Sequence, residues 1–446
     1  MIIDFAQVLR LALPDTPVQS TRFATTADRH LTRRGLVWLG QTCNLRCHFC
    51  YYLDRIEDPT HPEHAFMSLE KAKAICRTLV EVYGNNSVDI QGGEPTLWAP
   101  LPDLIRYCSE IGMQATVITN GIALDDMARV QAYREAGIRD IILSVQGLGD
   151  VYDGIVGRDG MWVRQMKALR NLQQAGVPFR FNTVLSKPVL AQLSQIAELA
   201  IRTRAQVVNF LAFNPFDDQR LPGKRSAENV PRYAELTEPL TAALDTLEGA
   251  GVEANVRYVP LCIVPERHFK SMYNFQQLSY DLHENEFGGW TWTGEPPQRM
   301  ARGELAPPIE FGARPALGPL REPLRRLAVQ PTVGPWLEKG RRLSLRVWAT
   351  AANRFAAPES ADARYRAEAR SRARENLGYR FGKACQDCDL RRICDGFHGD
   401  YAEFIGTNDA RPVRVGAVID DPTHFIRAQR KALFPTDAAW VDRARP

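Results

Sequence analysis

The chain has 446 residues, 45% of them hydrophobic and 24% charged, which is the balance of a globular protein with a large core. Its formal net charge is only +4, so no global field indicates nucleic acid or a membrane surface as a partner. The sequence has no apolar run of about eighteen residues and no signal-peptide pattern at its N-terminus, so we expect neither a membrane span nor secretion.

Short apolar strands alternate with amphipathic helices from residue 35 to residue 257. The expected strands are 35–42, 87–91, 115–119, 140–145, 179–185 and 206–213, and the expected helices include 68–84, 101–111, 162–175 and 189–203. Such alternation with short connections predicts βαβ units and a parallel sheet. About six units fall short of a complete eight-unit barrel. We therefore predict an α/β fold, a partial (β/α)6 TIM barrel with its site at the C-terminal ends of the strands.

The composition changes beyond residue 257. Residues 296–335 hold nine prolines, and residues 298–380 carry 17 Lys/Arg against 8 Asp/Glu. Two interpretations stay open for this basic segment: a solvated helix face, or a surface for an acidic, phosphate-bearing or RNA partner. Aromatic residues at stacking spacing are lacking, which makes nucleic acid an unfavoured partner. We divide the chain into an N-terminal segment (1–34), the barrel (35–257), a partly helical connecting region (258–380) and a C-terminal region (381–446).

Six of the nine cysteines lie in two tight groups, Cys43/Cys47/Cys50 and Cys385/Cys388/Cys394. An odd, clustered set is typical of metal sites in a reducing cytoplasm, whereas secreted disulfide proteins are small and evenly studded with cysteine. Cys76 and Cys108 lie in amphipathic helical patterns, so we interpret them as core thiols.

The first group follows the first expected strand, with the spacing CxxxCxxC. Three thiolates on a [4Fe–4S] cluster leave one iron without a protein ligand, and that iron can bind a small molecule. The alternative is a zinc site that His48 completes. A second motif, Gly92-Gly93-Glu94-Pro95, ends the second expected strand. Its glycines allow a ligand to approach the backbone closely, and Glu94 can accept a hydrogen bond from an ammonium group.

Together the two motifs resemble the CxxxCxxC and GGEP signatures of the radical S-adenosylmethionine (radical SAM) superfamily. The resemblance implies a [4Fe–4S] cluster held by Cys43, Cys47 and Cys50, with S-adenosylmethionine on the open iron. Reductive cleavage of S-adenosylmethionine then gives a 5′-deoxyadenosyl radical that abstracts hydrogen from a substrate. The implied electron donor is a reductant protein such as flavodoxin or ferredoxin.

The same resemblance assigns cofactor-binding roles at other strand ends. The chain departs from the family pattern at Gln146, where an acidic residue or histidine is usual, and at Val156, where an arginine is usual; Arg158 is the nearest arginine. The implied cofactor-binding residues are Phe49, Gly92, Gly93, Glu94, Pro95, Asn120, Ser144, Arg158 and Asn182.

The second cysteine group has the spacing CxxCx5C, which resembles the C-terminal motif of SPASM and twitch extensions and implies an auxiliary [4Fe–4S] cluster. We favour Cys262 as the fourth ligand beside Cys385, Cys388 and Cys394. His398 competes for that role, an open iron is a third arrangement, and a zinc site with His398 is the non-redox alternative. Residues near these motifs are candidates for acid–base or radical-quenching roles or for plain structural ones: Tyr258, His268, Asp395, His398 and Tyr401.

These features predict a cytoplasmic radical enzyme that acts on a small-molecule or peptide substrate by oxidation, cross-linking, epimerisation or rearrangement, assisted by an auxiliary cluster. About 34 residues precede the first strand, too few for the winged-helix domain that grips leader peptides in some relatives, which disfavours a peptide. Two alternatives remain: an RNA- or nucleic-acid-acting factor that uses residues 298–380, and a non-redox zinc-binding interaction protein.

Overall fold

The computed structural model describes residues 4–16, 22–28, 32–61, 63–81, 83–213, 227–287 and 378–437, with a few separate positions between 323 and 343. Most of the basic 298–380 segment lies outside the described residues. Within the described parts of the chain, no helix is both long and apolar enough to cross a membrane.

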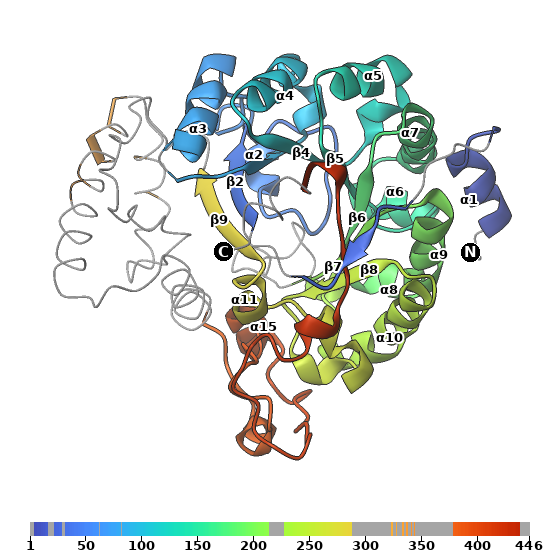
Figure 1. Ribbon diagram of the computed structural model, residues 1–446, viewed down its shortest axis with the longest axis vertical. Helices are drawn as coiled ribbons and strands as arrows, with labels where there is room; N and C mark the ends of the chain where they lie inside the picture. The colour runs from blue at the N-terminus through green and yellow to red at the C-terminus, as the bar shows by residue number, and fades with distance from the viewer. Residues whose placement is uncertain are drawn as a thin grey trace.

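A single curled sheet of eight parallel strands forms the centre of the molecule, with helices around its outer face (Figure 1). Its order is β8-β7-β6-β5-β4-β3-β2-β9. The strands are β2 (Thr32–Trp38), β3 (Ser87–Gln91), β4 (Gln114–Thr119), β5 (Asp140–Ser144), β6 (Phe179–Leu185), β7 (Val207–Ala212), β8 (Glu253–Arg257) and β9 (Leu282–Phe287). In the described sheet β8 and β9 are the two edges, so the barrel is open between them, as expected for a partial barrel.

The outer helices follow amphipathic patterns. In α3, the residues Ala72, Ile75, Cys76 and Leu79 recur on one face and are fully buried, which is why this segment packs as a helix against the sheet. The helices are α1 (Phe5–Ala12), α2 (Leu53–Glu57), α3 (Leu69–Glu81), α4 (Leu101–Glu110), α5 (Met127–Glu135), α6 (Asp150–Val156), α7 (Met161–Ala175), α8 (Lys187–Leu190), α9 (Leu193–Thr203), α10 (Tyr233–Gly249), α11 (Phe275–Leu278) and α15 (Gly399–Phe404). Cys76 and Cys108 are both fully buried, as predicted for core thiols.

All six expected strands are present, and the sheet has two more. Strand β8 extends the barrel beyond the sixth unit, and β9 returns to the opposite edge, where Leu282 lies opposite Thr32 of β2. Strand β9 lies in the segment predicted as a connecting region, because nothing local in its sequence indicates a partner 250 residues earlier.

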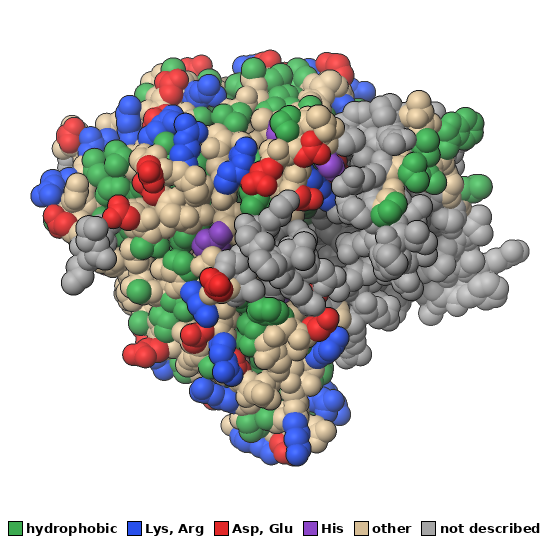
Figure 2. All heavy atoms as spheres, turned by 180° about the vertical axis from the view of Figure 1, so that it is seen from behind, with side chains coloured by type: hydrophobic (Ala, Val, Ile, Leu, Met, Phe, Trp, Pro, Cys, Tyr) green, Lys and Arg blue, Asp and Glu red, His purple; other side chains and the backbone are tan. Residues whose placement is uncertain are grey.

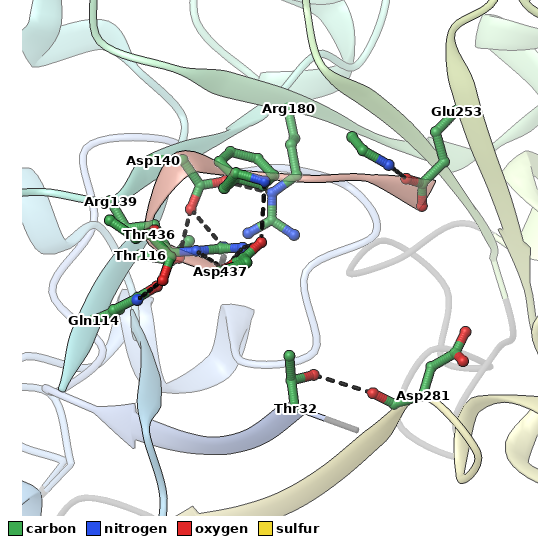
Figure 3. A network of polar contacts seen from close by, with 12 residues as sticks. Thr32, Gln114, Thr116, Arg139, Asp140, Arg180, Glu253, Asp281, Thr436 and Asp437 are labelled. Atoms are coloured by element: carbon green, nitrogen blue, oxygen red, sulfur yellow. Dashed lines mark hydrogen bonds and ion pairs between the residues drawn. The ribbon is translucent and has the colours of Figure 1, made fainter. Parts of the chain in front are cut away.

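A buried charge network lines the barrel interior at the N-terminal ends of the strands (Figure 3). Asp140 is fully buried, accepts a hydrogen bond from Thr116 Oγ1 at 2.6 Å, and forms ion pairs with Arg139 and Arg180. Asp437, near the end of the described chain, accepts two hydrogen bonds from Arg139 Nη2, both at 3.0 Å. Charged groups from three regions of the chain therefore neutralise one another out of water.

The C-terminal segment closes this end of the barrel. In Figure 1 it runs back from the C-terminal region across the barrel, and β10 (Lys431–Ala432) pairs with β1 (Thr25–Thr26) in an antiparallel ladder. Lys431 Nζ donates to Glu253 Oε1 at 2.8 Å, and the Phe434 ring lies 4.1 Å from the Arg139 guanidinium. We call residues 431–437 the floor segment, because they cover the end of the barrel opposite the strands' C-terminal ends.

We expect Asp140→Asn to lower the free energy of unfolding by about 3–5 kcal/mol, because it leaves Arg139 and Arg180 without their shared buried counter-charge. Burial tends to raise the pKa of Asp140, but the two arginines and their hydrogen bonds outweigh it and leave the pKa below 3.8. The stabilisation is therefore fully present above pH 3.8 and is lost as the pH falls through the lowered pKa. Chemical denaturation at several pH values measures both effects.

The matched control is Asp103→Asn, which removes a carboxylate from an exposed ion pair with Arg106 and should change stability by less than about 0.5 kcal/mol. Equal effects of the two substitutions at neutral pH would contradict a structural role for the buried network.

Candidate functional site

The cluster loop, residues 39–52, leaves β2 at the C-terminal end of the sheet and is held by backbone contacts. Arg46 N donates to Val156 O at 2.9 Å and His48 N to Ile155 O at 3.0 Å, which fastens the loop to the end of α6. Leu45 is 2% exposed and anchors the loop in the core. The loop is thus a rigid support for the three cysteines it carries.

The three thiols of this loop lie near one another and are partly buried. Burial, then the Glu94 carboxylate and the Cys50 thiol, raise the pKa of Cys43 to about 12. Burial and the thiols of Cys50 and Cys43 also raise the pKa of Cys47. Leu45 N–H donates to Cys43 Sγ at 3.5 Å. Three gathered sulfur donors with amide hydrogen bonds fit the ligand set of an iron–sulfur cluster.

His48 packs between two aromatic rings. Its ring lies 5.7 Å from Phe49 in an edge-on contact and 6.0 Å from Phe213 in a stacked one. Burial lowers the pKa of His48 to about 4, so the ring is neutral at physiological pH. His48 and Phe49 thereby form, with Phe213, an apolar wall beside the cysteines.

The Gly92-Gly93-Glu94 motif is fastened to the cluster loop backbone to backbone. Gly93 N donates to Gly40 O at 2.7 Å, and Glu94 N donates to Thr42 O at 2.8 Å. A Cβ on Gly93 would lie 2.2 Å from Thr42 O, and one on Gly92 2.4 Å from Gly40 O. The glycines are therefore needed for close approach to the loop, whereas the sequence suggested approach to a ligand.

Glu94 is 1% exposed and is oriented by four hydrogen bonds. Oε1 accepts from Thr96 N, Thr96 Oγ1 and Thr119 Oγ1, and Oε2 accepts from Asn120 N at 2.8 Å. Burial raises its pKa, and these hydrogen bonds oppose the rise. Among the described residues Oε2 has a single donor, so it keeps capacity for one more.

Asn120 connects the end of β4 to the cluster loop, since its Nδ2 donates to Asn44 Oδ1 at 2.8 Å. Arg158 reaches the same loop, with Nη1 3.4 Å from Asn44 O, and its side chain is exposed. Pro95 begins the 3₁₀ helix η1 (Pro95–Leu97) directly after Glu94. Sequence reasoning missed Asn44 and Thr119, which hold these groups together; their places in the CNLRC and ITNG segments are the only signal for them.

Ser144 and Asn182 lie directly opposite each other in the β5–β6 ladder. They share the strand parity of Asp140 and Arg180, so their side chains face the barrel interior. In the described parts of the chain neither side chain has a hydrogen-bond partner, which leaves both available to a ligand.

Gln146 stands where the family pattern has an acidic residue or histidine, and its side chain hydrogen-bonds to the backbone of β6. Its Oε1 accepts from Val184 N at 2.8 Å and its Nε2 donates to Asn182 O at 3.2 Å. Both ends of the amide are thus used on the backbone of β6, and Gln146 braces the strand that carries Asn182.

The second cysteine group gathers against the barrel, and Cys262 joins it. Cys262 lies on the 3₁₀ helix η5 (Leu261–Ile263) after β8, and burial and the thiols of Cys385 and Cys388 raise its pKa. Burial raises the pKa of Cys394 as well, with Cys262 as a further cause. Gly396 N donates to Cys394 Sγ at 3.3 Å and Val413 N to Cys388 Sγ at 3.4 Å. Among the described residues no three acidic, His or Cys side chains converge tightly enough to hold one metal ion.

The five candidate acid–base residues all have structural contacts. His398 Nδ1 accepts from Asp400 N at 3.3 Å and so caps α15. Tyr401 OH accepts from Tyr233 N at 2.7 Å, and Asp395 Oδ2 accepts from Phe275 N at 2.7 Å. The last two contacts join the C-terminal region to α10 and α11.

His268 is 1% exposed and lies between two carboxylates of α10, 2.8 Å from Asp245 Oδ1 and 3.4 Å from Glu248 Oε2. Tyr258 follows β8 in a left-handed conformation with a φ of 67° and packs on the Phe275 ring, 5.5 Å away. Tyr258 therefore holds the turn that leads from β8 to Cys262, and His268 holds the 3₁₀ helix η6 (Glu266–Ser271), which follows Cys262, against α10.

Fold and site together define an open α/β barrel with a thiol-lined loop at the C-terminal ends of its strands. Residues 39–200 match the family model of the Radical SAM superfamily. The chain therefore carries a radical SAM domain.

Relatives of known activity match only part of the chain. An AdoMet-dependent heme synthase of Oleidesulfovibrio alaskensis is 33% identical over 177 residues, which are 39% of this chain and 44% of that protein. A PqqA peptide cyclase of Granulibacter bethesdensis is 31% identical over 181 residues, 39% of this chain and 46% of that one. The structure of Streptococcus suis SuiB bound to S-adenosylmethionine aligns with a TM-score of 0.43 at 17% identity, over 61% of this chain and 63% of SuiB. The chain thus spans less than half the length of these two sequence relatives.

We expect Gly93→Ala to reduce the iron bound after anaerobic reconstitution to about half that of the wild type or less, because the added Cβ would displace Thr42, beside Cys43. Gly154→Ala in α6 is the matched control, since its Cβ meets nothing within 4 Å and should leave the iron content unchanged. Iron and sulfide analysis measures both; a Gly93→Ala protein with full iron content would refute the close-packing argument.

Proposed function

We propose that this radical SAM enzyme cleaves S-adenosylmethionine reductively at a [4Fe–4S] cluster held by Cys43, Cys47 and Cys50, and abstracts hydrogen from a small-molecule or peptide substrate. The observation that carries the proposal is the loop of three gathered thiols, fastened to Glu94 through the backbone of Thr42. When bound, the cluster and S-adenosylmethionine supply an electron and a carbon-centred radical.

The chain's own side chains are proposed to bind and orient S-adenosylmethionine. Glu94 Oε2, with one donor among the described residues, is suited to accept from the ammonium group of S-adenosylmethionine. Ser144 and Asn182, which have no protein partner among the described residues, face the barrel interior and suit the carboxylate and ribose of S-adenosylmethionine. The Phe49 and Phe213 rings exclude water on the side of His48.

The C-terminal cysteines are proposed to hold an auxiliary [4Fe–4S] cluster, with Cys262 as the fourth ligand. In support, Cys262 lies within electrostatic reach of Cys385 and Cys388, although more than a hundred residues separate them. His398 is less suited, because its Nδ1 caps α15 and its ring packs on Tyr379 at 5.2 Å.

The reaction is proposed to be an oxidation, cross-link, epimerisation or rearrangement in which the auxiliary cluster assists, with flavodoxin or ferredoxin as the reductant. The heme synthase and peptide cyclase among the relatives motivate keeping both substrate classes. Figure 2 shows Lys and Arg interspersed with Asp and Glu over the described part of the face opposite to that of Figure 1, and most of the basic 298–380 segment lies outside the described residues.

We expect the reconstituted wild type to bind about eight irons per chain and a Cys43/Cys47/Cys50→Ala triple variant about four, since each [4Fe–4S] cluster accounts for four. Only the wild type should form 5′-deoxyadenosine from S-adenosylmethionine and dithionite. Cys76→Ala, which alters a thiol outside both groups, is the control for losing a cysteine. Nucleoside formation by the triple variant would refute the assignment.

We expect Cys262→Ser to remove or alter the auxiliary cluster's paramagnetic resonance signal and to leave the signal of the first cluster intact. His398→Ala should retain both signals, because the histidine serves as a helix cap. The reverse pattern would make His398 the fourth ligand, and zinc in place of the second set of irons would favour the non-redox alternative.

A further inference from the structure

The barrel interior contains a cavity of about 160 Å³ whose walls carry five cationic side chains. Four of them have carboxylate partners: Arg34 pairs with Asp89, Arg139 with Asp437, Arg180 with Asp140, and Lys431 with Glu253. Arg257 is the exception. Among the described residues it has no hydrogen bond or ion pair, and its Nε is buried without an acceptor.

Arg257 is the last residue of β8, so it lies at the end of the sheet where the cluster loop, Ser144 and Asn182 also lie. Its position in the ladder is opposite Leu211, which offers no polar group. Asn255, two residues earlier on the same face of β8, is already engaged with a different partner, because its Nδ2 donates to Asn209 Oδ1 at 3.2 Å. The Arg257 side chain therefore borders the interior cavity, which extends from the floor segment to Asn209 and Asn255, the in-register neighbours of Asn182.

The backbone after Arg257 is fixed in a costly conformation. Tyr258 has a φ of 67°, which side chains other than glycine rarely adopt. The surroundings hold it there: Tyr233 OH donates to Tyr258 O at 3.2 Å, and Asn274 Nδ2 donates to Val259 O at 2.8 Å. Arg257 therefore extends from a rigidly held backbone, and among the described residues no carboxylate pairs with it.

A partly buried cation without a partner is expensive, and its retention is explained if a ligand brings the opposite charge. A guanidinium offers a planar fork of donors that matches a carboxylate or a phosphate. We infer that Arg257 binds an anionic group of the substrate, a carboxylate or a phosphate. This inference rests on the proposed function, since it assigns a substrate class to that site.

Two sources of such an anion are distinguished by titration of the reconstituted protein. S-adenosylmethionine itself carries a carboxylate, so its affinity is measured first in the wild type and in Arg257→Gln. Inorganic phosphate and succinate are then titrated as probes of the substrate group, by calorimetry and by the shift of the thermal unfolding temperature. The charge control is Arg202→Gln, on the outer face of α9, which removes an arginine from an exposed pair with Glu198.

The expected result is at least a tenfold loss of phosphate or succinate affinity in Arg257→Gln, none in Arg202→Gln, and unchanged affinity for S-adenosylmethionine. Without added anion, Arg257→Gln should unfold at the wild-type temperature or higher, because it removes an unpaired charge. A drop in unfolding temperature of more than about 4 °C would show a structural role and overturn the proposal. So would a wild type that binds neither probe, or a variant that loses S-adenosylmethionine.

These outcomes are separable from a failure of the proposed function. Anion binding is read without turnover, whereas formation of 5′-deoxyadenosine tests the radical chemistry. Arg257→Gln should form this nucleoside at the wild-type rate when no substrate is present; a rate more than tenfold lower would place Arg257 in the machinery for S-adenosylmethionine and overturn its assignment to substrate.

Discussion

The site depends on one contact, the approach of the Gly93 backbone to the carbonyl oxygen of Thr42. It leaves no room for a Cβ, and it brings the end of β3 against the loop that follows β2. Through it the cysteines, Glu94 and the end of β4 share one rigid frame: Glu94 accepts from Asn120 N, and the Asn120 side chain donates to Asn44. A small displacement here moves a sulfur ligand and a carboxylate together, which is the kind of positional error that catalysis tolerates poorly.

The two ends of the barrel are built on opposite principles. At the N-terminal ends of the strands, buried charges satisfy one another, and the floor segment supplies two of the partners, Lys431 and Asp437. At the C-terminal ends, polar groups such as Ser144 and Asn182 have no protein partner among the described residues. The first arrangement stabilises the fold; the second keeps hydrogen-bonding capacity free for molecules that bind.

The sequence predicts the parts whose signal is local. Strands β3 and β6 match their expected bounds residue for residue, because apolar runs between polar turns define them. Strand β9 could not be predicted, since its partner β2 is 250 residues away. The cysteine spacings indicate the cofactor loop, but they do not indicate that Arg257 lacks a carboxylate partner among the described residues, because that depends on which carboxylates reach its neighbours. Gln146 shows the same limit, because its bracing of β6 depends on contacts between strands.

The pairing of β10 with β1 joins the two ends of the described chain, about 400 residues apart. Closing so long a loop costs conformational entropy that no local contact offsets, so we expect this ladder to follow the local contacts in folding. During synthesis the strands of the barrel leave the ribosome before the floor segment does. The nascent protein therefore passes through a stage in which the cysteine loop has been synthesised but the floor segment has not. At that stage the far end of the barrel is open to water, and Arg139 lacks its partner Asp437.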